Sequence, residues 1–376
     1  MQKTIFILPV IFMLPANVVH MSGKASVSGT DDITEDIEQY FDFEDIEQLL
    51  EGKEESVNFT EIVKAFAKGD TKSGADKFVD IIRKNLFLEL SVNKEAIRKI
   101  LALAFVTALF SNFAGIFKNS QVSDMGFLIC YVAIMTYLLG SFAALSYIAY
   151  EVMKNTADFM QALLPVYAVS VGVSDGQANA VSYYEMALGV IGIAEFVSIK
   201  LLFPAINIYT GLSMVNHLGK EDYLSKTCDL IKSVVNFSVK TMLTIVMGLN
   251  IIQKMFSPLS GGIGGNAARN VINTISGISL AGNGIAELLY GTGRIVKSTI
   301  GGAGVVVLCV IMLVPLIKMI VFVLSYQLSG AIVQPVSDKR ITKCITCVNE
   351  GAVMLLHVVF AVMLMFVVTI AIICIG

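Results

Sequence analysis

The sequence has 376 residues, of which 55% are hydrophobic and 15% are charged, and its formal net charge is −3. A mean hydropathy of +0.74 lies far above that of soluble globular domains and predicts an integral membrane protein. The same composition argues against a nucleic-acid-binding protein, because no basic face or aromatic stacking platform accompanies the lysines and arginines.

The first 25 residues have the layout of a secretory signal peptide. Lys3 supplies a positive start, an apolar core runs from 4 to 19, and Gly23-Lys24-Ala25 offers a small-x-small cleavage site. We expect cleavage after Ala25, with a retained signal anchor as the alternative. Either outcome places the following segment outside the cytoplasm.

The segment 26–96 is predicted to be a small, acidic, helical region outside the cytoplasm. Between residues 26 and 99 lie 18 of the 30 acidic residues, against 10 basic ones. Asn58-Phe-Thr-Glu61 matches a capping box, and a second amphipathic helix is predicted from about residue 75. A region of this size fits a helical cap or a partner-binding arm better than an enzyme domain.

Eight apolar stretches are candidate membrane spans. Their approximate limits are 97–117, 126–150, 159–173, 178–199, 201–218, 234–252, 305–328 and 352–375. About 20 apolar residues suffice to cross the hydrocarbon core, but 159–173 is short and contains Pro165, which favours a broken or tilted span there. The predicted fold class is all-α: a polytopic transmembrane bundle of about six to eight spans, with transmembrane helices in 97–256 and 305–376.

The stretch 257–304 is rich in glycine and separates the two sets of spans. It holds twelve of the 30 glycines, which permit close helix contacts and backbone breaks. We expect two or three short helices that form a broken or re-entrant segment packed on the bundle; a glycine-rich extramembrane loop is the alternative. The candidate hinge or close-packing glycines are Gly261, Gly262, Gly264, Gly265, Gly282, Gly284, Gly291, Gly293, Gly301 and Gly302.

An even number of spans places the C-terminus on the same side as the N-terminal region, outside the cytoplasm, and the glycine-rich stretch with it. The turns at 118–125, 219–233 and 329–351 then face the cytoplasm. These turns carry seven lysines and arginines, against six in the outer connections. The difference is a weak positive-inside bias that favours this topology.

Four ionisable residues inside the candidate spans are the sharpest functional signal, because each costs roughly 2.5–3.5 kcal/mol at mid-bilayer. They are Glu185, Glu195, Lys240 and Lys318. We predict a Glu195–Lys318 pair inside the bundle, either as a structural contact or as part of a conduction or proton-relay path. Glu185, next to two tyrosines, fits an interfacial position, and Lys240 with Asn236 fits an interhelical hydrogen bond or a lumen.

The cysteines and glycines do not form a recognisable chemical site. Cys344-Ile-Thr-Cys347 is a lone CxxC, and zinc requires further ligands that the sequence does not place nearby. An inert reduced pair is the expectation and metal binding the alternative. The glycine pairs lack the strand and the GK[ST] sequence of a nucleotide site, and the three histidines are scattered. We therefore expect no enzymatic activity, no cofactor and no resident metal.

Several segments from residue 201 onward resemble the stage III sporulation protein AE family of endospore-forming bacteria. The residues that carry the resemblance are KLLFPAINIYTGLSMVN at 200–216, KTMLTIVMGLNIIQKMFSP at 240–258, GTGRIVKSTIGGAG at 291–304 and QPVSDKRI at 334–341. They occur in a fixed order, and none of them is a catalytic motif. The resemblance becomes fainter in the earlier spans.

The resemblance implies a role in sporulation. Such proteins are expected in the mother-cell membrane that surrounds the forespore, as part of a secretion-like channel or feeding-tube complex required for endospore development. The implied partners are the other proteins of that assembly, a forespore membrane protein and the lipid bilayer, with no nucleic acid. A secondary transporter that moves a small solute is an alternative, because glycine-interrupted segments beside buried charges also build transporter sites. A purely structural scaffold, whose N-terminal arm recruits partners, is a third.

Overall fold

The computed structural model describes the backbone of residues 43–50, 60, 62–63, 94–95, 97–102, 105–106, 120–218, 223–276, 282–335 and 337–374. Regular structure in these ranges is helical throughout, which confirms the predicted all-α fold. The elements are α4 (Glu44–Leu50), α7 (Ser120–Asp175), α8 (Gln177–Ile193), η2 (Ala194–Leu202), α9 (Phe203–Asn216), α10 (Ser225–Ser276), α11 (Gly282–Val333) and α12 (Lys339–Cys374). The signal peptide predicted at 1–25 and the capping box around Asn58 lie outside the described residues, except for Thr60.

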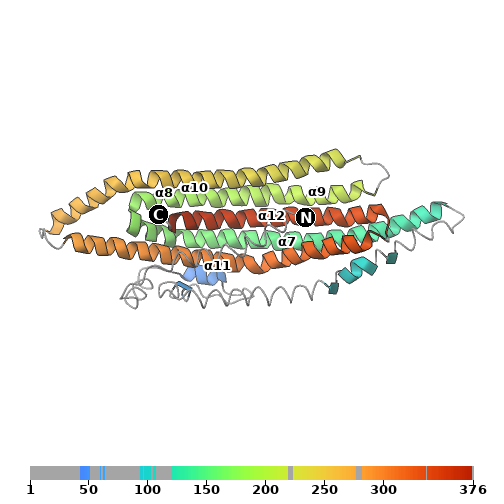
Figure 1. Cartoon of the computed structure of the whole chain (residues 1–376), viewed down its shortest axis with the longest axis horizontal. Coiled ribbons are helices and arrows are strands. Elements are labelled where there is room, and N and C mark those ends of the chain that lie inside the picture. The colour runs from blue at the N-terminus through green and yellow to red at the C-terminus, as the bar shows by residue number, and fades with distance from the viewer. Residues whose placement is uncertain are drawn as a thin grey trace.

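The long helices lie side by side in one elongated bundle (Figure 1). At one end lie the connection between α9 and α10, around 217–224, and the one between α11 and α12, around 334–338; we call this the pocket end. The connection between α7 and α8, at 173–176, lies at the opposite end, together with the tips of α10 and α11; we call this the hairpin end (Figure 1).

Helix α7 joins two predicted spans into one helix of 56 residues. The expected interruption between 150 and 159 is absent, because residues 151–158 contain neither glycine nor proline and continue the helix. Pro165 lies inside the helix and is exposed, so its ring disturbs the surface rather than the packed core. The prediction of two separate spans, 126–150 and 159–173, is therefore wrong in this region.

Helices α8 and α9 also form one continuous rod, where two spans, 178–199 and 201–218, were expected. They are joined by η2, a nine-residue π-helix that contains Glu195 and Lys200. The wider π register accommodates Pro204, which has no N–H to donate, and the N–H of Phe203 bonds instead to the carbonyl of Ser198.

The glycine-rich stretch does not form separate short helices in the described residues. The backbone of 257–276 continues α10 without interruption, and α11 begins at Gly282 and runs through all the remaining predicted hinge glycines. Glycine lowers helix stability by about 1 kcal/mol but does not forbid the helix, and the flanking apolar segments extend it. The tips of α10 and α11 project beyond the other helices at the hairpin end (Figure 1).

Five helical stretches of the described chain are long and apolar enough to cross a membrane. They are Met125–Gly172, Gln177–Asn216, Ser225–Gln253, Val296–Val333 and Lys339–Ile372. The described residues therefore support a multi-pass protein, in which two pairs of the candidate spans are each merged into one longer helical stretch. Most of the first predicted span, 97–117, falls outside the described residues.

The hydrophobic core runs along the whole bundle, with α11 and α12 at its centre. In the most apolar windows of these two spans, 67% of the residues are buried, against 22% in α10, which lies at the edge. Two glycines lie in close contact with a neighbouring helix. A Cβ on Gly304 would lie 2.7 Å from Cδ2 of Leu163, and one on Gly351 would clash with Oγ1 of Thr210.

Candidate functional site

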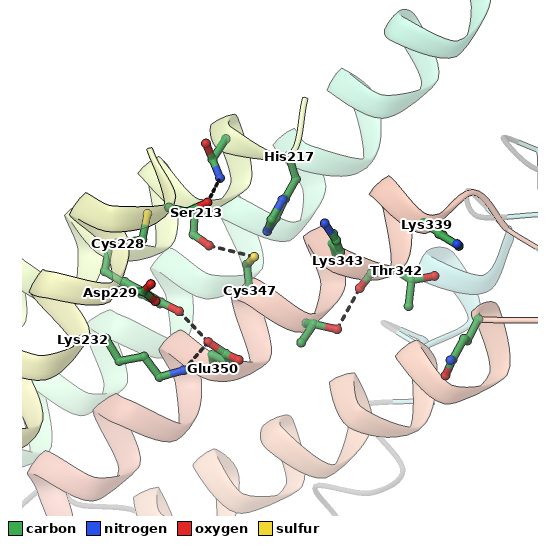
Figure 2. Close-up of a pocket in the computed structure, with 15 residues that line it drawn as sticks. Ser213, His217, Cys228, Asp229, Lys232, Lys339, Thr342, Lys343, Cys347 and Glu350 are labelled. Carbon is green, nitrogen blue, oxygen red and sulfur yellow. Dashed lines mark hydrogen bonds and ion pairs between the residues drawn. The ribbon is translucent and has the colours of Figure 1, made fainter. Parts of the chain in front are cut away.

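A polar cavity of about 580 Å³ opens at the pocket end, between α9, α10 and α12 (Figure 2). Its lining comprises Tyr209, Ser213, Asn216 and His217 of the α9 segment, Ser225, Cys228, Asp229 and Lys232 of α10, and Gln334, Lys339, Thr342, Lys343, Thr346, Cys347 and Glu350 around α12. We take it as the candidate site because it gathers charged, hydroxyl and thiol groups in a bundle that is otherwise mostly apolar.

An ion pair between two helices forms one wall of the cavity. The ammonium of Lys232 lies 2.8 Å from Oε2 of Glu350, and both side chains are about two-fifths exposed. The hydroxyl of Tyr209 donates to the same carboxylate oxygen at 2.5 Å. Glu350 thus links α9, α10 and α12, and its charge is balanced while it remains accessible from the cavity (Figure 2).

Thiols line the adjacent part of the cavity. The hydroxyl of Ser213 donates to Sγ of Cys347 at 2.9 Å, and Cys228 is buried nearby on α10. Cys344 and Cys347 lie near the start of α12, and both are buried free thiols. Within the described part of the chain, no group of three or more His, Cys, Asp or Glu residues is placed to hold a metal ion.

Hydrogen bonds fix the rim of the cavity at the connection between α9 and α10. The side-chain oxygen of Asn216 accepts from the backbone N–H of Leu224 at 2.7 Å, and its amide nitrogen donates to Oγ of Ser225 at 3.2 Å. Lys339 and Lys343 are exposed on the opposite side of the rim. The arrangement can bind a small polar or charged group from water.

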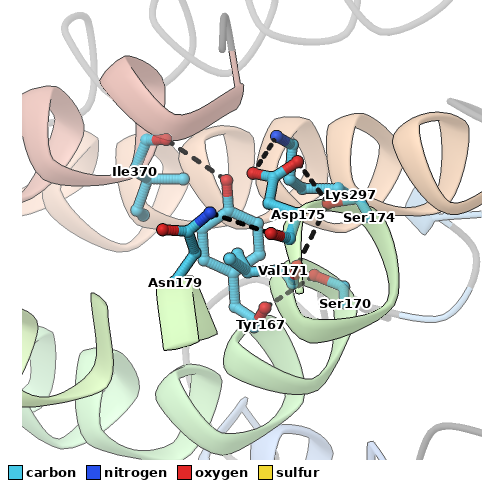
Figure 3. A network of polar contacts seen from close by, with 8 residues as sticks. All are labelled: Tyr167, Ser170, Val171, Ser174, Asp175, Asn179, Lys297 and Ile370. Atoms are coloured by element: carbon cyan, nitrogen blue, oxygen red, sulfur yellow. Dashed lines mark hydrogen bonds and ion pairs between the residues drawn. The ribbon is translucent and has the colours of Figure 1, made fainter. Parts of the chain in front are cut away.

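A second polar network lies at the hairpin end and is more enclosed (Figure 3). Lys297 of α11 places its ammonium 2.8 Å from Oδ2 of Asp175, with its own side chain 2% exposed and that of Asp175 23% exposed. The hydroxyl of Ser174 donates to the other oxygen of Asp175 at 3.0 Å. This contact attaches the glycine-rich segment to the connection between α7 and α8.

The backbone around Asp175 is shaped for this contact. Gly176 has a φ of 94°, which L-residues with side chains rarely adopt, and it turns the chain from α7 into α8. The side-chain amide of Asn179 donates to the carbonyl of Asp175 at 2.8 Å. Earlier in α7, the hydroxyl of Ser170 donates to the carbonyl of Tyr167, and the hydroxyl of Tyr167 donates to the carbonyl of Ile370 of α12 at 3.4 Å (Figure 3).

The ionisable residues predicted from the sequence lie apart from both networks. Glu185 is exposed on α8, Glu195 is half-buried on η2, Lys240 is exposed on α10, and Lys318 is half-buried on α11. The predicted pair between Glu195 and Lys318 is not formed; the ion pairs among the described residues are Lys99–Glu95, Lys232–Glu350, Lys297–Asp175 and Arg340–Asp338. The apolar residues around Glu195 were read as bundle interior, but on η2 they border an outward face.

The predicted glycines are distributed over both long helices. Gly261, Gly262, Gly264 and Gly265 lie in α10, and Gly282, Gly284, Gly291, Gly293, Gly301 and Gly302 lie in α11. Gly301 is buried, whereas the close helix contacts described above occur at Gly304 and Gly351. Sequence reasoning missed Glu350, Lys232, Asp175 and Lys297. The Asp-Gly pair at 175–176 is a turn signal that marks one of them.

Comparison with known proteins identifies the family. The family model for stage III sporulation protein AE matches residues 57–376. The stage III sporulation protein AE of Bacillus subtilis (strain 168) is 21% identical over 302 residues, which cover 80% of this chain and 76% of that relative. No solved structure matches. Because the family model covers most of the sequence, the chain belongs to the stage III sporulation protein AE family.

Proposed function

We propose that this chain is a non-enzymatic membrane component of the channel complex that connects the mother cell with the forespore during endospore development. Family membership supports a role in sporulation, and five candidate spans support a multi-pass membrane protein. In this proposal the chain lies in the mother-cell membrane around the forespore. Its partners are the other proteins of the assembly and a forespore membrane protein.

A polar line on the outer face of α10 carries the proposal. Five exposed polar residues follow one another at intervals of three or four, and so fall on one side of the helix: Lys226, Asp229, Ser233, Asn236 and Lys240. The line occupies the first half of the candidate span Ser225–Gln253. None of the ion pairs among the described residues uses its charged members.

Lipid is an unfavourable neighbour for such a line. Each charged side chain costs roughly 2.5–3.5 kcal/mol at the bilayer centre, and polar groups in spans are normally turned toward protein or water. Helix α10 lies at the edge of the bundle. Asp229 borders the cavity, and the other four residues of the line are exposed on the outer side of the helix. A neighbouring protein or a water-filled path satisfies these groups, and a channel assembly offers both.

Substitution on this line tests the proposal. We expect Lys240→Leu combined with Asn236→Leu to abolish late forespore gene expression, measured with a forespore reporter in sporulating cells, while the protein still accumulates in the membrane. The control is Phe237→Leu combined with Val234→Leu, which changes exposed apolar residues of the same helix and should leave expression normal. Normal development with the polar line removed would refute the proposal.

The cavity favours a secondary transporter as a second candidate. A water-accessible volume of about 580 Å³ with a charged pair in its wall suits a small polar solute. Uptake by the purified protein in liposomes, driven by a proton or sodium gradient and lost in Glu350→Gln, would support transport. Absence of uptake across a panel of amino acids, nucleosides and sugars would leave the channel component as the better function.

A further inference from the structure

The membrane-spanning helices are much longer than a bilayer is thick. The candidate span of α7 has 48 residues, which at 1.5 Å per residue make about 72 Å, against a hydrocarbon core of about 30 Å. Fewer than half of its residues can lie in hydrocarbon at one time. The chemistry of the outer surface therefore has to indicate which part of the bundle contacts lipid.

The exposed face of α7 changes character abruptly near residue 150. From 125 to 150 the helix contains no charged residue, and Ile129 (70% exposed) and Val132 (42%) point outward. Tyr147 and Tyr150 are exposed at the end of this stretch. Glu151, Lys154 and Gln161 follow on the exposed surface. An uncharged face that ends in tyrosines and continues into charges is the pattern of a helix that leaves a membrane.

The surfaces of the neighbouring helices also pass from uncharged to charged at the level of residue 150 of α7. Ring contact between Tyr150 and Phe203 places the start of α9 beside this point of α7, and the residues of α9 from 203 to 216 are uncharged. On the other side of that level, η2 exposes Lys200. A sulfur contact between Ser198 and Met242 then brings Lys240 of α10 to the same height.

Helix α11 follows the same division. Gly304 of α11 lies against Leu163 of α7, so Lys318, 14 residues further along the antiparallel helix, lies level with about residue 149 of α7, close to Glu151. From Met319 to Val333, α11 is uncharged. Five charged residues thus encircle the middle of the bundle, and we call them the girdle: Glu151, Lys154, Lys200, Lys240 and Lys318.

We propose that hydrocarbon covers only the half of the bundle between the girdle and the pocket end, and that the other half stands in water. The uncharged stretch of α7, residues 125–150, is about 38 Å long and suffices to cross the bilayer. Lys226, Lys339 and Lys343 lie at the pocket end and form its cytoplasmic boundary, in agreement with the positive-inside rule.

The surface of helix α4 supports the proposal that the half of the bundle nearer the hairpin end stands in water. It packs on α7 through the buried Phe43 and Ile46, and Figure 1 shows it (blue) alongside the half of the bundle nearer the hairpin end. Its outer face carries Glu44 and Gln48, which hydrogen-bond to each other on the surface. An acidic surface helix at this level is suited to water and not to hydrocarbon.

Two helices do not follow this division: α8 exposes Val181 and Leu188 in the outer half, and α10 carries the polar line. Its polar residues lie in the membrane half and its exposed Ile245, Ile251 and Ile252 in the outer half, which reverses the order on α7. If the proposed function holds, α10 contacts other proteins or an aqueous path along this face, so its surface does not report on lipid. The placement therefore rests mainly on α7, η2, α9 and α11, and α10 contributes only the positions of Lys226 and Lys240 along the bundle.

The consequence is an asymmetric protein. From the girdle to Asp175 the bundle extends about 32 Å, and the tips of α10 and α11 reach further. The Asp175–Lys297 pair then lies inside the part of the bundle that stands outside the hydrocarbon on the extracytoplasmic side, and the glycine-rich tips are available to partners in the space between membranes. The cavity, at the opposite end, opens toward the cytoplasm.

Single tryptophans test the placement directly, since the chain contains none. Val132 and Val169 form a matched pair: the same residue type on the same helix, 42% and 55% exposed, one in each half. The full-length protein is reconstituted in vesicles containing bromine-labelled phosphatidylcholine. We expect Val132→Trp to lose most of its emission to the brominated lipid, and Val169→Trp to be unaffected by it and quenched by aqueous iodide.

Two further variants keep the test decisive if either protein folds poorly. Leu128→Trp should behave as Val132→Trp, and Gln161→Trp as Val169→Trp, because each pair lies in the same half of α7 and all four residues are exposed. Equal lipid quenching at 132 and 169 would mean that the bilayer is centred on the girdle, and stronger quenching at 169 would place it around the hairpin half. Either result overturns the proposal. Both are independent of the sporulation phenotype that tests the proposed function.

Discussion

The two ends of the bundle each contain a lysine–carboxylate pair with the same separation but in different surroundings. Lys232–Glu350 and Lys297–Asp175 both have 2.8 Å between nitrogen and oxygen. The first pair borders an open cavity, with side chains 41% and 39% exposed, whereas the lysine of the second is 2% exposed. Distance alone therefore does not show what each pair contributes.

Exposure to water determines what each of the two ion pairs contributes. In the open cavity, water can replace either partner, so the pair contributes little to stability and its groups remain available for binding. At the hairpin end, removing one partner leaves an uncompensated charge with limited access to water. The Lys297–Asp175 pair consequently stabilises the fold, whereas the Lys232–Glu350 pair is accessible to a ligand or partner.

Substitution of Lys297 should give the largest effect. We expect Lys297→Met to lower the free energy of unfolding by about 3 kcal/mol, because Asp175 is left unpaired in a largely buried position. Thermal unfolding in detergent, followed by helical circular dichroism, measures the loss. The double variant Lys297→Met with Asp175→Asn removes both charges and should recover most of it; no recovery would show that the lysine acts through packing and not through the pair.

Substitutions at two glycines, one in each half of the bundle, compare how tightly the two halves are packed. Gly351 lies against Thr210 and Phe142, and a Cβ there would lie 3.0 Å from Cε2 of Phe142 in addition to its clash with Thr210. We expect Gly351→Ala to destabilise the protein by about 1–3 kcal/mol through overpacking. Gly304→Ala meets only the flexible end of Leu163 and gains helix propensity, so it should be nearly neutral. Equal losses in thermal unfolding would contradict this reading.

Glu350→Gln should have a smaller effect on stability. The pair is exposed to the cavity, so its loss should lower the free energy of unfolding by less than about 1 kcal/mol, and the amide can still accept from Tyr209. The same unfolding assay tests this. A loss as large as that of Lys297→Met would show that the cavity excludes water.

The sequence predicted the helices better than their ends. Apolar stretches of span length identified the transmembrane class, but residues 151–158 and 200–204 were read as interruptions. The first continues α7 because it contains no helix breaker, and the second is bridged by a π-helix around Pro204. In both places, continuation depends on neighbouring helices that a local pattern does not contain.

The candidate sites were harder to predict because their partners are distant in the chain. Lys232 and Glu350 are 118 residues apart, and Asp175 and Lys297 are 122 apart. Charges within apolar stretches can be read from the sequence, but hydropathy does not indicate which lysines and carboxylates form pairs. Glu195 and Lys318 were matched by burial alone, and the outward position of Glu195 on η2 separates them.

The smallest expected effect is the energetic coupling between Glu195 and Lys318. Because Glu195 and Lys318 do not form an ion pair, Glu195→Gln and Lys318→Met should have additive effects on the free energy of unfolding, with a coupling below about 0.5 kcal/mol. The matched cycle on Asp175 and Lys297 should give a coupling several times larger, because those groups are in contact. Thermal unfolding of the four variants in each cycle provides both values. A comparable coupling in the two cycles would mean that Glu195 and Lys318 meet in the membrane, and that the girdle lies inside the bilayer.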